Sequence, residues 1–177
     1  SFFLEHWLYL PSIGLVICLG EWLSQQKFVS QSVMRPAVVG VALAWGVLTF
    51  MQNKVWATPI SFYTNILQYE SKVARVYNNL AMAYSSDNDD DRAIENYMKG
   101  LTISDEYPQP HHNLALALIR KNRLQEAVAH LERALEINKD FYHSSGVLAQ
   151  IYHGLGNMKL ADEYSRRSAE SLAKFPR

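Results

Sequence analysis

One pattern occurs three times along this chain at a constant spacing. Each occurrence has a Leu-Ala pair followed by a further alanine: Leu80-Ala81 with Ala93, Leu114-Ala115 with Ala127, and Leu148-Ala149 with Ala161. A 34-residue interval, with small residues where two helices touch, is typical of stacked helical hairpins. Because each hairpin buries its apolar face only against its neighbours, we predict an all-α solenoid that holds a partner in its curve.

Each repeat is predicted to hold two helices joined by a short turn. In the first helix a bulky residue follows the Leu-Ala pair after three positions, so these residues share one helical face. The bulky residues are Tyr84, Leu118 and Tyr152, and the turns are expected around Asn88, Asn122 and Gly156. This phase predicts three units at about residues 74–107, 108–141 and 142–175.

The pattern resembles the tetratricopeptide repeat (TPR), whose 34-residue unit has a leucine, a small residue, an aromatic residue and a second-helix alanine at these positions. The resemblance covers about residues 74–175. Two features depart from it: Asp105 and Lys139 stand where the family usually has a closing proline, and Tyr164 comes one position early. We therefore expect the second helix of the third unit to act as a cap.

The same phase continues upstream of the first full unit. Tyr63 and Leu67 precede Tyr97 and Leu101 by one repeat interval. Residues 61–69 are therefore predicted to form the second helix of a partial unit, within a segment at 56–73. Few glycines or serines separate this helix from the apolar segment before it, which predicts a rigid connection and not a flexible tether.

The segment at residues 1–55 differs in character from the repeats. It contains two apolar runs, Trp7–Leu23 and Ala37–Met51, in which Glu21 is the single charged residue. Since a transmembrane helix needs about 20 mostly apolar residues, we predict two such helices at about 7–23 and 34–52. The alternative is that both runs are buried helices of a soluble protein, for which shorter apolar runs are normal.

The loop between the two predicted spans carries positive charge. It contains Lys27 and Arg35 and no acidic residue, and cytoplasmic loops tend to be rich in lysine and arginine. We therefore expect this loop in the cytoplasm and the repeats on the extracytoplasmic side, in the periplasm or a lumen. Lys54, beyond the second span, counts against this orientation.

The first helices of the repeats are expected to line the concave surface of the solenoid. Asn79 and Asn113 directly precede the Leu-Ala pairs of adjacent units, and a carboxamide can both donate to and accept from an extended peptide backbone. They resemble the asparagine ladder of repeats that deliver polypeptides to sugar transferases, although Val147 interrupts the ladder in the third unit. The alternative is that these asparagines only bridge neighbouring helices. Four further residues are predicted to line the groove: Arg75, Asn78, His112 and Gln150.

One short segment is more specific than hydrophobicity requires. Glu5–Gly14 (EHWLYLPSIG) resembles the LYLPS-x-G segment late in the membrane region of polytopic GT-C-type, O-mannosyltransferase-like glycosyltransferases that end in TPR repeats. The resemblance implies that this chain is the C-terminal part of a longer transferase that uses lipid-linked sugars. The family's catalytic acid lies in an early extracytoplasmic loop, which does not match any segment of this sequence.

Several functions have no support in the sequence. Equal numbers of basic and acidic residues, 17 of each, leave no basic surface for DNA or RNA. The histidines lack metal-ligand spacing, and the acidic run Asp87–Asp91 lacks the glycine and glutamate of a calcium loop, so we interpret it as a helix cap. No phosphate-binding loop, serine elbow or Cys-His pair occurs. We expect neither a metal nor a cofactor, and no residue of the chain is assigned to catalysis.

Two functional hypotheses remain open. The first is a membrane-anchored module that recruits or presents a polypeptide at the extracytoplasmic membrane face, as the C-terminal part of a glycosyltransferase. The second is a non-catalytic scaffold subunit of a membrane or envelope complex. In both, the partner is a protein or peptide in the concave groove, and the module can belong to a larger complex.

Overall fold

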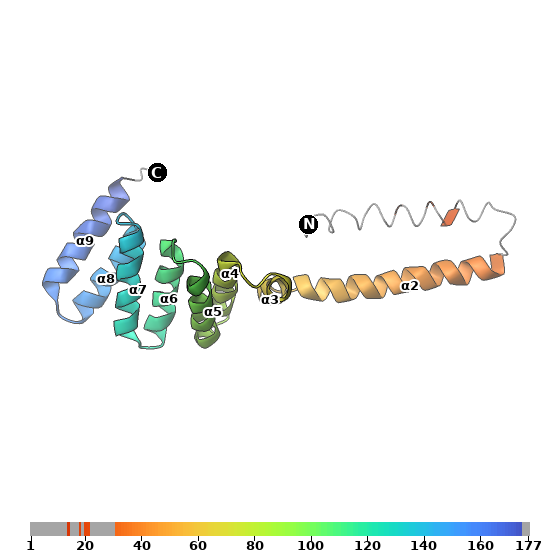
Figure 1. Ribbon diagram of the computed structural model, residues 1–177, viewed down its shortest axis with the longest axis horizontal. Helices are drawn as coiled ribbons and strands as arrows, with labels where there is room; N and C mark the ends of the chain where they lie inside the picture. Colours follow the sequence, from red (N-terminus) through yellow and green to blue (C-terminus); the bar gives the residue numbers. More distant parts are fainter. Residues whose placement is uncertain (1–13, 15–17, 19, 22–30, 175–177) are drawn as a thin grey trace. The chain divides into compact units, whose positions relative to one another are not determined.

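The computed structural model describes residues 31–174 and, near the N-terminus, residues 14, 18, 20 and 21. Its complete elements are all α-helices, and no strand occurs among these residues (Figure 1). The helices are α2 (Gln31–Trp56), α3 (Pro59–Tyr69), α4 (Ala74–Ser86), α5 (Asp90–Ile103), α6 (Pro108–Arg120), α7 (Leu124–Ile137), α8 (Tyr142–Gly154) and α9 (Met158–Ala173). The chain divides into two compact units, residues 1–54 and 55–177.

Helix α2 does not support the predicted membrane span at about 34–52. No helix among the described residues is long and apolar enough to cross a membrane. The apolar run of α2 is confined to Ala37–Met51. A helix of this extent covers about 22 Å at 1.5 Å per residue, while the hydrocarbon core of a bilayer is about 30 Å thick. The other predicted span, at about 7–23, falls almost entirely outside the described residues.

The second unit begins where α2 ends. Thr58 caps α3, because its side chain accepts a hydrogen bond from the Ser61 N–H at 3.1 Å and Pro59 starts the helix. The ring of Trp56 packs against Phe62 of α3 at a centroid distance of 4.8 Å. Helix α3 in turn packs against α4, as the second helix of a preceding hairpin would.

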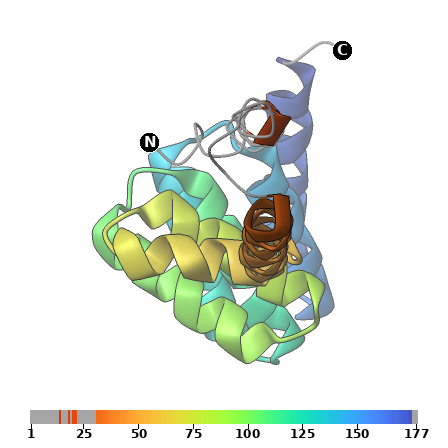
Figure 2. The same ribbon diagram turned by 90° about the vertical axis from the view of Figure 1, so that its right-hand side faces the viewer.

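Helices α4 to α9 form three hairpins that stack in sequence order. Within the hairpins α4 pairs with α5, α6 with α7 and α8 with α9, and the hairpins meet through α5 against α6 and α7 against α8. Figure 1 shows this row of helices side by side, and Figure 2, turned by 90°, shows the same helices one behind another. The all-helical solenoid predicted from the repeated pattern is therefore confirmed.

The three hairpins turn at equivalent residues. Asn88, Asn122 and Gly156 have positive φ values of 61°, 59° and 74°, the left-handed conformation typical of a helix C-terminus. The residue after each of them donates its N–H to the carbonyl of the bulky first-helix residue at 2.9 Å: Asp89 to Tyr84, Arg123 to Leu118 and Asn157 to Tyr152. The predicted turns are confirmed, and asparagine and glycine are the residues that adopt this conformation most readily.

The repeated leucines and alanines form the core. All of them are buried, and the neighbouring small residues allow the helices to approach closely. At Gly100 of α5 a Cβ atom would lie 3.2 Å from the carbonyl oxygen of Ala74 and 3.3 Å from Cβ of Tyr77. In the third unit the early Tyr164 stacks on Tyr152 with ring centroids 5.7 Å apart, so the displaced aromatic side chain still contributes to its hairpin.

The acidic run stabilises the start of α5 and its contact with the next hairpin. Asp89 caps α5 by accepting a hydrogen bond from the Arg92 N–H at 3.1 Å, which confirms the helix-cap interpretation. Nε of Arg120 on α6 donates to the Asp90 carboxylate, whose two oxygens lie 3.0 and 2.9 Å away, and Nη2 donates to Oδ1 at 2.6 Å. The aspartates therefore hold two consecutive repeats together.

Candidate functional site

The first helices of the hairpins contact one another directly. Helix α4 contacts α6, and Nδ1 of His112 on α6 lies 3.1 Å from Oγ of Ser144 on α8. Helices on the inner side of a curved stack approach each other most closely, so we call α4, α6 and α8 the inner helices and their shared surface the inner face. All six residues predicted to contact a partner lie on these helices: Arg75, Asn78 and Asn79 on α4, His112 and Asn113 on α6, and Gln150 on α8.

A cavity of about 170 Å³ lies where α4 begins, α5 ends and α6 begins. We call it the α4–α6 cavity. Its lining combines apolar and aromatic groups with a few polar side chains: Ala74, Arg75, Asn78, Tyr97, Gly100, Ser104, Tyr107, Gln109 and Pro110. The structure therefore brings two of the six predicted residues, Arg75 and Asn78, to one cavity.

Asn78 has an unused hydrogen-bond acceptor beside this cavity. Its Oδ1 atom is buried and accepts no hydrogen bond from the described residues. Its Nδ2 lies 3.6 Å from Sδ of Met82, which is a weak acceptor. A buried acceptor without a partner costs about 1–3 kcal/mol.

Arg75 is a cation that forms no ion pair with the residues that the structure describes. Its side chain is exposed and forms no ion pair within the described part of the chain. Five other arginines each pair with a nearby carboxylate: Arg92 with Asp89, Arg120 with Asp90, Arg123 with Glu126, Arg133 with Asp105 and Arg166 with Glu170. The guanidinium of Arg75 is therefore available to an anionic group on a partner.

The two tyrosines of the cavity differ in burial. Tyr97 of α5 is 2% exposed, and this burial raises the pKa of its hydroxyl to about 12. Tyr107, just before α6, is 56% exposed. The cavity therefore has one fixed, uncharged aromatic wall and a second aromatic ring that a ligand can reach.

The asparagines of the predicted ladder are half-buried on adjacent helices. Asn79 and Asn113 form no side-chain hydrogen bond with any of the described residues, so their donors and acceptors are unused. Gln150 on α8 is exposed and likewise has no partner in this part of the chain. Val147, which interrupts the ladder, packs against the core. No hydrogen bond among these residues supports the alternative that the asparagines bridge neighbouring helices.

His112 contributes to the packing between α6 and α8. Its ring meets Phe141 edge-on with centroids 5.5 Å apart, in addition to its bond with Ser144. Burial, followed by the charge of His143, lowers the pKa of His112 to about 4, so the ring is neutral near pH 7. The structure thus adds a packing role to the predicted partner contact of this residue.

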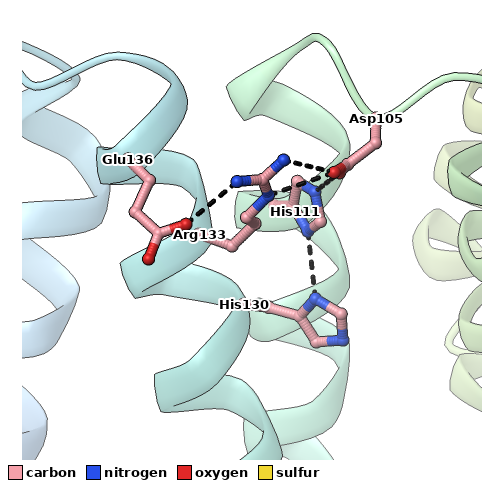
Figure 3. Close-up of polar contacts among 5 residues, drawn as sticks. All are labelled: Asp105, His111, His130, Arg133 and Glu136. Carbon is pink, nitrogen blue, oxygen red and sulfur yellow. Dashed lines mark hydrogen bonds and ion pairs between the residues drawn. The ribbon is translucent and has the colours of Figure 1, made fainter.

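A polar cluster that the sequence analysis did not single out joins the first hairpin to the second (Figure 3). In this cluster Nδ1 of His111 lies 3.0 Å from Nδ1 of His130, and its Nε2 bonds to Asp105. Nε of Arg133 donates to Asp105 at 3.1 Å, and its Nη1 donates to Glu136 at 2.9 Å. Hydrogen bonds from Arg133 and then His111 hold the pKa of Asp105 below its usual range.

Some residues of the cavity and of the polar cluster were not predicted from the sequence, and they differ in how far the sequence could have indicated them. Asp105 stands where the family usually has proline, and a carboxylate in place of a rigid residue could have indicated a new polar contact. Gln109 follows Arg75 by one repeat interval, so the repeat itself places it at an equivalent position. Tyr97 and Ser104 gave no such signal, because an aromatic residue in a second helix and a serine just after it are ordinary in a packed hairpin.

Comparison with protein-family models identifies the repeats. Residues 74–107 and 142–171 match one model of the tetratricopeptide repeat, and residues 108–141 match another. A comparison with curated protein sequences finds no match.

Solved structures share the same arrangement of helices. A crystal structure of MamA superposes with a TM-score of 0.63 at 18% sequence identity, covering 65% of this chain and 67% of that one. YrrB, described as a TPR protein with an unusual peptide-binding site, superposes with a TM-score of 0.57 at 25% identity, covering 61% of this chain. This chain spans 56% of YrrB and 63% of a second MamA structure, which has a TM-score of 0.60 at 18% identity.

Proposed function

This chain belongs to the tetratricopeptide-repeat family, and we propose that its solenoid binds an extended polypeptide along the inner face. One observation carries the proposal: hydrogen-bonding and charged groups that have no partner among the described residues gather on adjacent inner helices. On α4 these are the carboxamide of Asn79 and the guanidinium of Arg75, and on α6 the carboxamide of Asn113. YrrB, with its peptide-binding site, makes a peptide ligand a reasonable expectation for this solenoid.

The two asparagines suit an extended backbone. Each carboxamide can donate to a carbonyl and accept from an N–H of the same peptide. A hydrogen bond of this kind contributes about 0.5–1.5 kcal/mol. Two such contacts on adjacent repeats would therefore fix the register of a bound chain as well as its affinity.

The proposal is tested with short random peptides displayed on phage and selected on the purified full chain. Synthetic copies of the selected peptides are then titrated against the Asn79→Ala/Asn113→Ala double variant by fluorescence anisotropy. We expect the dissociation constant to rise about tenfold or more, while the circular dichroism spectrum and melting temperature stay unchanged. Gln125→Ala is the matched control, because Gln125 is exposed on the second helix α7. Equal affinity of the double variant and the control would refute binding at the inner face.

The membrane context of the solenoid is a further part of the proposal. Every described side chain of α2 from Pro36 to Met51 is exposed, and a continuous apolar surface of this kind is normally covered by lipid or by another protein. The segment Glu5–Gly14, with its resemblance to O-mannosyltransferase-like enzymes, favours a place at the end of a membrane glycosyltransferase, with the repeats on the extracytoplasmic side. A scaffold subunit of an envelope complex is the alternative.

These alternatives make different predictions. An extracytoplasmic solenoid would be cut by a protease added to intact spheroplasts and protected in sealed inside-out vesicles. The opposite pattern would reverse the orientation, and a protein recovered without membranes would refute the membrane context. A gene whose upstream part encodes many apolar spans and an acidic first loop would favour the transferase over the scaffold subunit.

A further inference from the structure

We propose that the α4–α6 cavity binds the ring of a phenylalanine or tyrosine in the partner polypeptide, packed against Tyr97 and Tyr107. The ring takes a place between the first two hairpins that side chains of the chain itself occupy between the next two. This proposal rests on the proposed peptide-binding function and names the kind of side chain that the inner face selects.

The cavity has room for one six-membered ring. Its volume is about 170 Å³, and an engineered apolar cavity of about 150 Å³ in another protein binds benzene. Ala74, Gly100 and Pro110 contribute apolar surface to the lining. A phenyl or phenol ring therefore fits the cavity in size and in character.

At the interface between the second and third hairpins, the equivalent residues contact one another. Four lining residues, Asn78, Tyr107, Gln109 and Pro110, correspond one repeat interval later to His112, Phe141, His143 and Ser144. The rings of His112, Phe141 and His143 have pairwise centroid distances between 5.2 and 5.9 Å. Nδ1 of His112 also lies 3.1 Å from Oγ of Ser144. Three rings in mutual contact thus close the second interface at this place.

The first interface keeps only one ring of this cluster. Asn78 and Gln109 carry carboxamides where the next unit has imidazole rings, and Tyr107 is the ring that remains. Tyr107 is 56% exposed and contacts no other aromatic ring within the described part of the chain. The α4–α6 cavity therefore lies where the next interface has its ring cluster, and a ring from the partner would complete the equivalent cluster here.

The lining favours an aromatic side chain over an aliphatic one of similar size. Tyr97 lines the cavity where the next unit has Leu131, and Tyr107 has ring surface that a ligand can cover. Aromatic rings attract one another in offset or edge-on arrangements at centroid distances of about 4.5–7 Å, beyond the effect of the area that they bury. A leucine of the partner would bury similar surface without this attraction.

The cavity lies beside the predicted path of the bound peptide. Asn79, which we propose to hold the peptide backbone, directly follows the lining residue Asn78 on α4. Side chains of an extended peptide point alternately to its two sides. A peptide held by Asn79 can therefore direct one side chain into the cavity while its backbone stays on the inner face.

The test uses the peptides selected on the full chain for the proposed function. We expect phenylalanine or tyrosine at one fixed position of these peptides. Replacing that residue by leucine should raise the dissociation constant about threefold to tenfold, because the aromatic contacts are lost while most of the buried area is kept. The ring should also shift the amide resonances of Gly100 and Ser104 in nuclear magnetic resonance spectra, and the leucine peptide should not reproduce these shifts.

Variants of the protein separate ring binding from effects on folding. Tyr107→Leu removes the ring, and it should leave α6 intact because the Tyr107 side chain forms no capping hydrogen bond. We expect this variant to bind the aromatic and the leucine peptide with nearly equal affinity, whereas Tyr107→Phe, which keeps the ring, should preserve the difference. Asn78→His introduces the residue of the next unit and should fill the cavity, so the difference should disappear there too. Gln125→Ala again serves as the control, since it leaves the inner face unchanged.

The failure of this proposal and of peptide binding itself are distinguishable. If selected peptides bind through Asn79 and Asn113 but bind equally well with leucine in place of the aromatic residue, the ring site is refuted and the peptide-binding function stands. An aromatic preference that persists undiminished in both Tyr107→Leu and Asn78→His would also refute binding of the ring in this cavity. If no peptide is selected, both proposals fail.

Discussion

The Nδ1 atoms of His111 and His130 lie 3.0 Å apart, and the two rings stack with centroids 5.3 Å apart. A hydrogen bond between them needs one protonated and one unprotonated Nδ1 atom, so it exists only while at least one ring is neutral. On the other side of His111, Nε2 bonds to Asp105 (Figure 3). Protonation of both rings would place two donors against each other and break this hydrogen bond between α6 and α7.

We expect the solenoid to lose stability as the pH falls from about 7 to about 5. Burial, followed by the charge of His111, lowers the pKa of His130, and the pKa of His112 is lowered to about 4. A histidine whose pKa falls on folding binds more protons when unfolded. Its contribution to stability is therefore complete above the unfolded pKa of about 6.5 and is lost as the pH falls towards the folded value.

Urea unfolding at several pH values measures this loss. The variant with His112→Gln and His130→Gln should show a smaller decrease in its urea midpoint over the same range, because two of the groups that take up protons on unfolding are gone. The carboxylates pair in both proteins and titrate at lower pH, so they do not obscure the difference. Equal pH dependence of the two proteins would contradict the role assigned to these histidines.

Replacing Asp105 should uncouple the first two hairpins. Asp105→Ala removes the hydrogen bonds from Arg133 and His111, and bonds to a charged group contribute about 1.5–3 kcal/mol each when well formed. Because Asp105 is partly exposed, we expect a total loss of about 1–2 kcal/mol. Chemical denaturation measures it, and Arg133→Gln alone and in combination should be non-additive with Asp105→Ala. Additive losses would show that the pair does not act as one unit.

Much of the fold could be predicted from the sequence because its constraints are local and repeat. A small residue is needed wherever two helices touch, as at Gly100, and a residue that tolerates positive φ is needed at each turn, as at Asn88, Asn122 and Gly156. Both requirements recur in every unit of the array. Each requirement appears in the sequence as a particular residue type at a fixed position of the repeat. One pattern therefore predicts three hairpins and their turns.

The site could be predicted only in part. Arg75 and Asn78 were assigned to the inner face because the first helices carry it, and both line the α4–α6 cavity. The cavity itself depends on the space that the side chains of three helices leave between them. It is lined by Tyr97 of α5 and by Ser104, the residue after that helix, and the repeat pattern describes this helix only by its packing positions. The environment of His112 could not be predicted for the same reason, since its ring contacts Phe141 at the far end of its own unit and Ser144 in the next unit.

Truncation of the central leucine should destabilise the whole stack. Leu114 is 0% exposed and lies in the cluster that joins all three hairpins. Leu114→Ala should therefore cost about 2–5 kcal/mol, the range for large-to-small changes in a packed core. Leu155→Ala is the matched control, because Leu155 is 62% exposed in the last turn, and it should change the unfolding free energy by less than about 0.5 kcal/mol. Similar losses for both variants would mean that Leu114 is not part of a packed core.

The turn between α8 and α9 should tolerate asparagine better than alanine. Gly156 has φ of 74°, and the equivalent turns hold Asn88 at 61° and Asn122 at 59°. A Cβ atom at Gly156 meets no atom within 4 Å, so any cost of substitution comes from the backbone conformation. Left-handed φ costs an ordinary residue about 1–2 kcal/mol, and asparagine less because its short polar side chain can bond locally. Gly156→Ala should therefore lower the unfolding free energy by about 1 kcal/mol, and Gly156→Asn by clearly less. Thermal and urea unfolding of both variants measure these free energies. A greater loss of stability for Gly156→Asn than for Gly156→Ala would show that the left-handed conformation does not determine which residue occupies these turns.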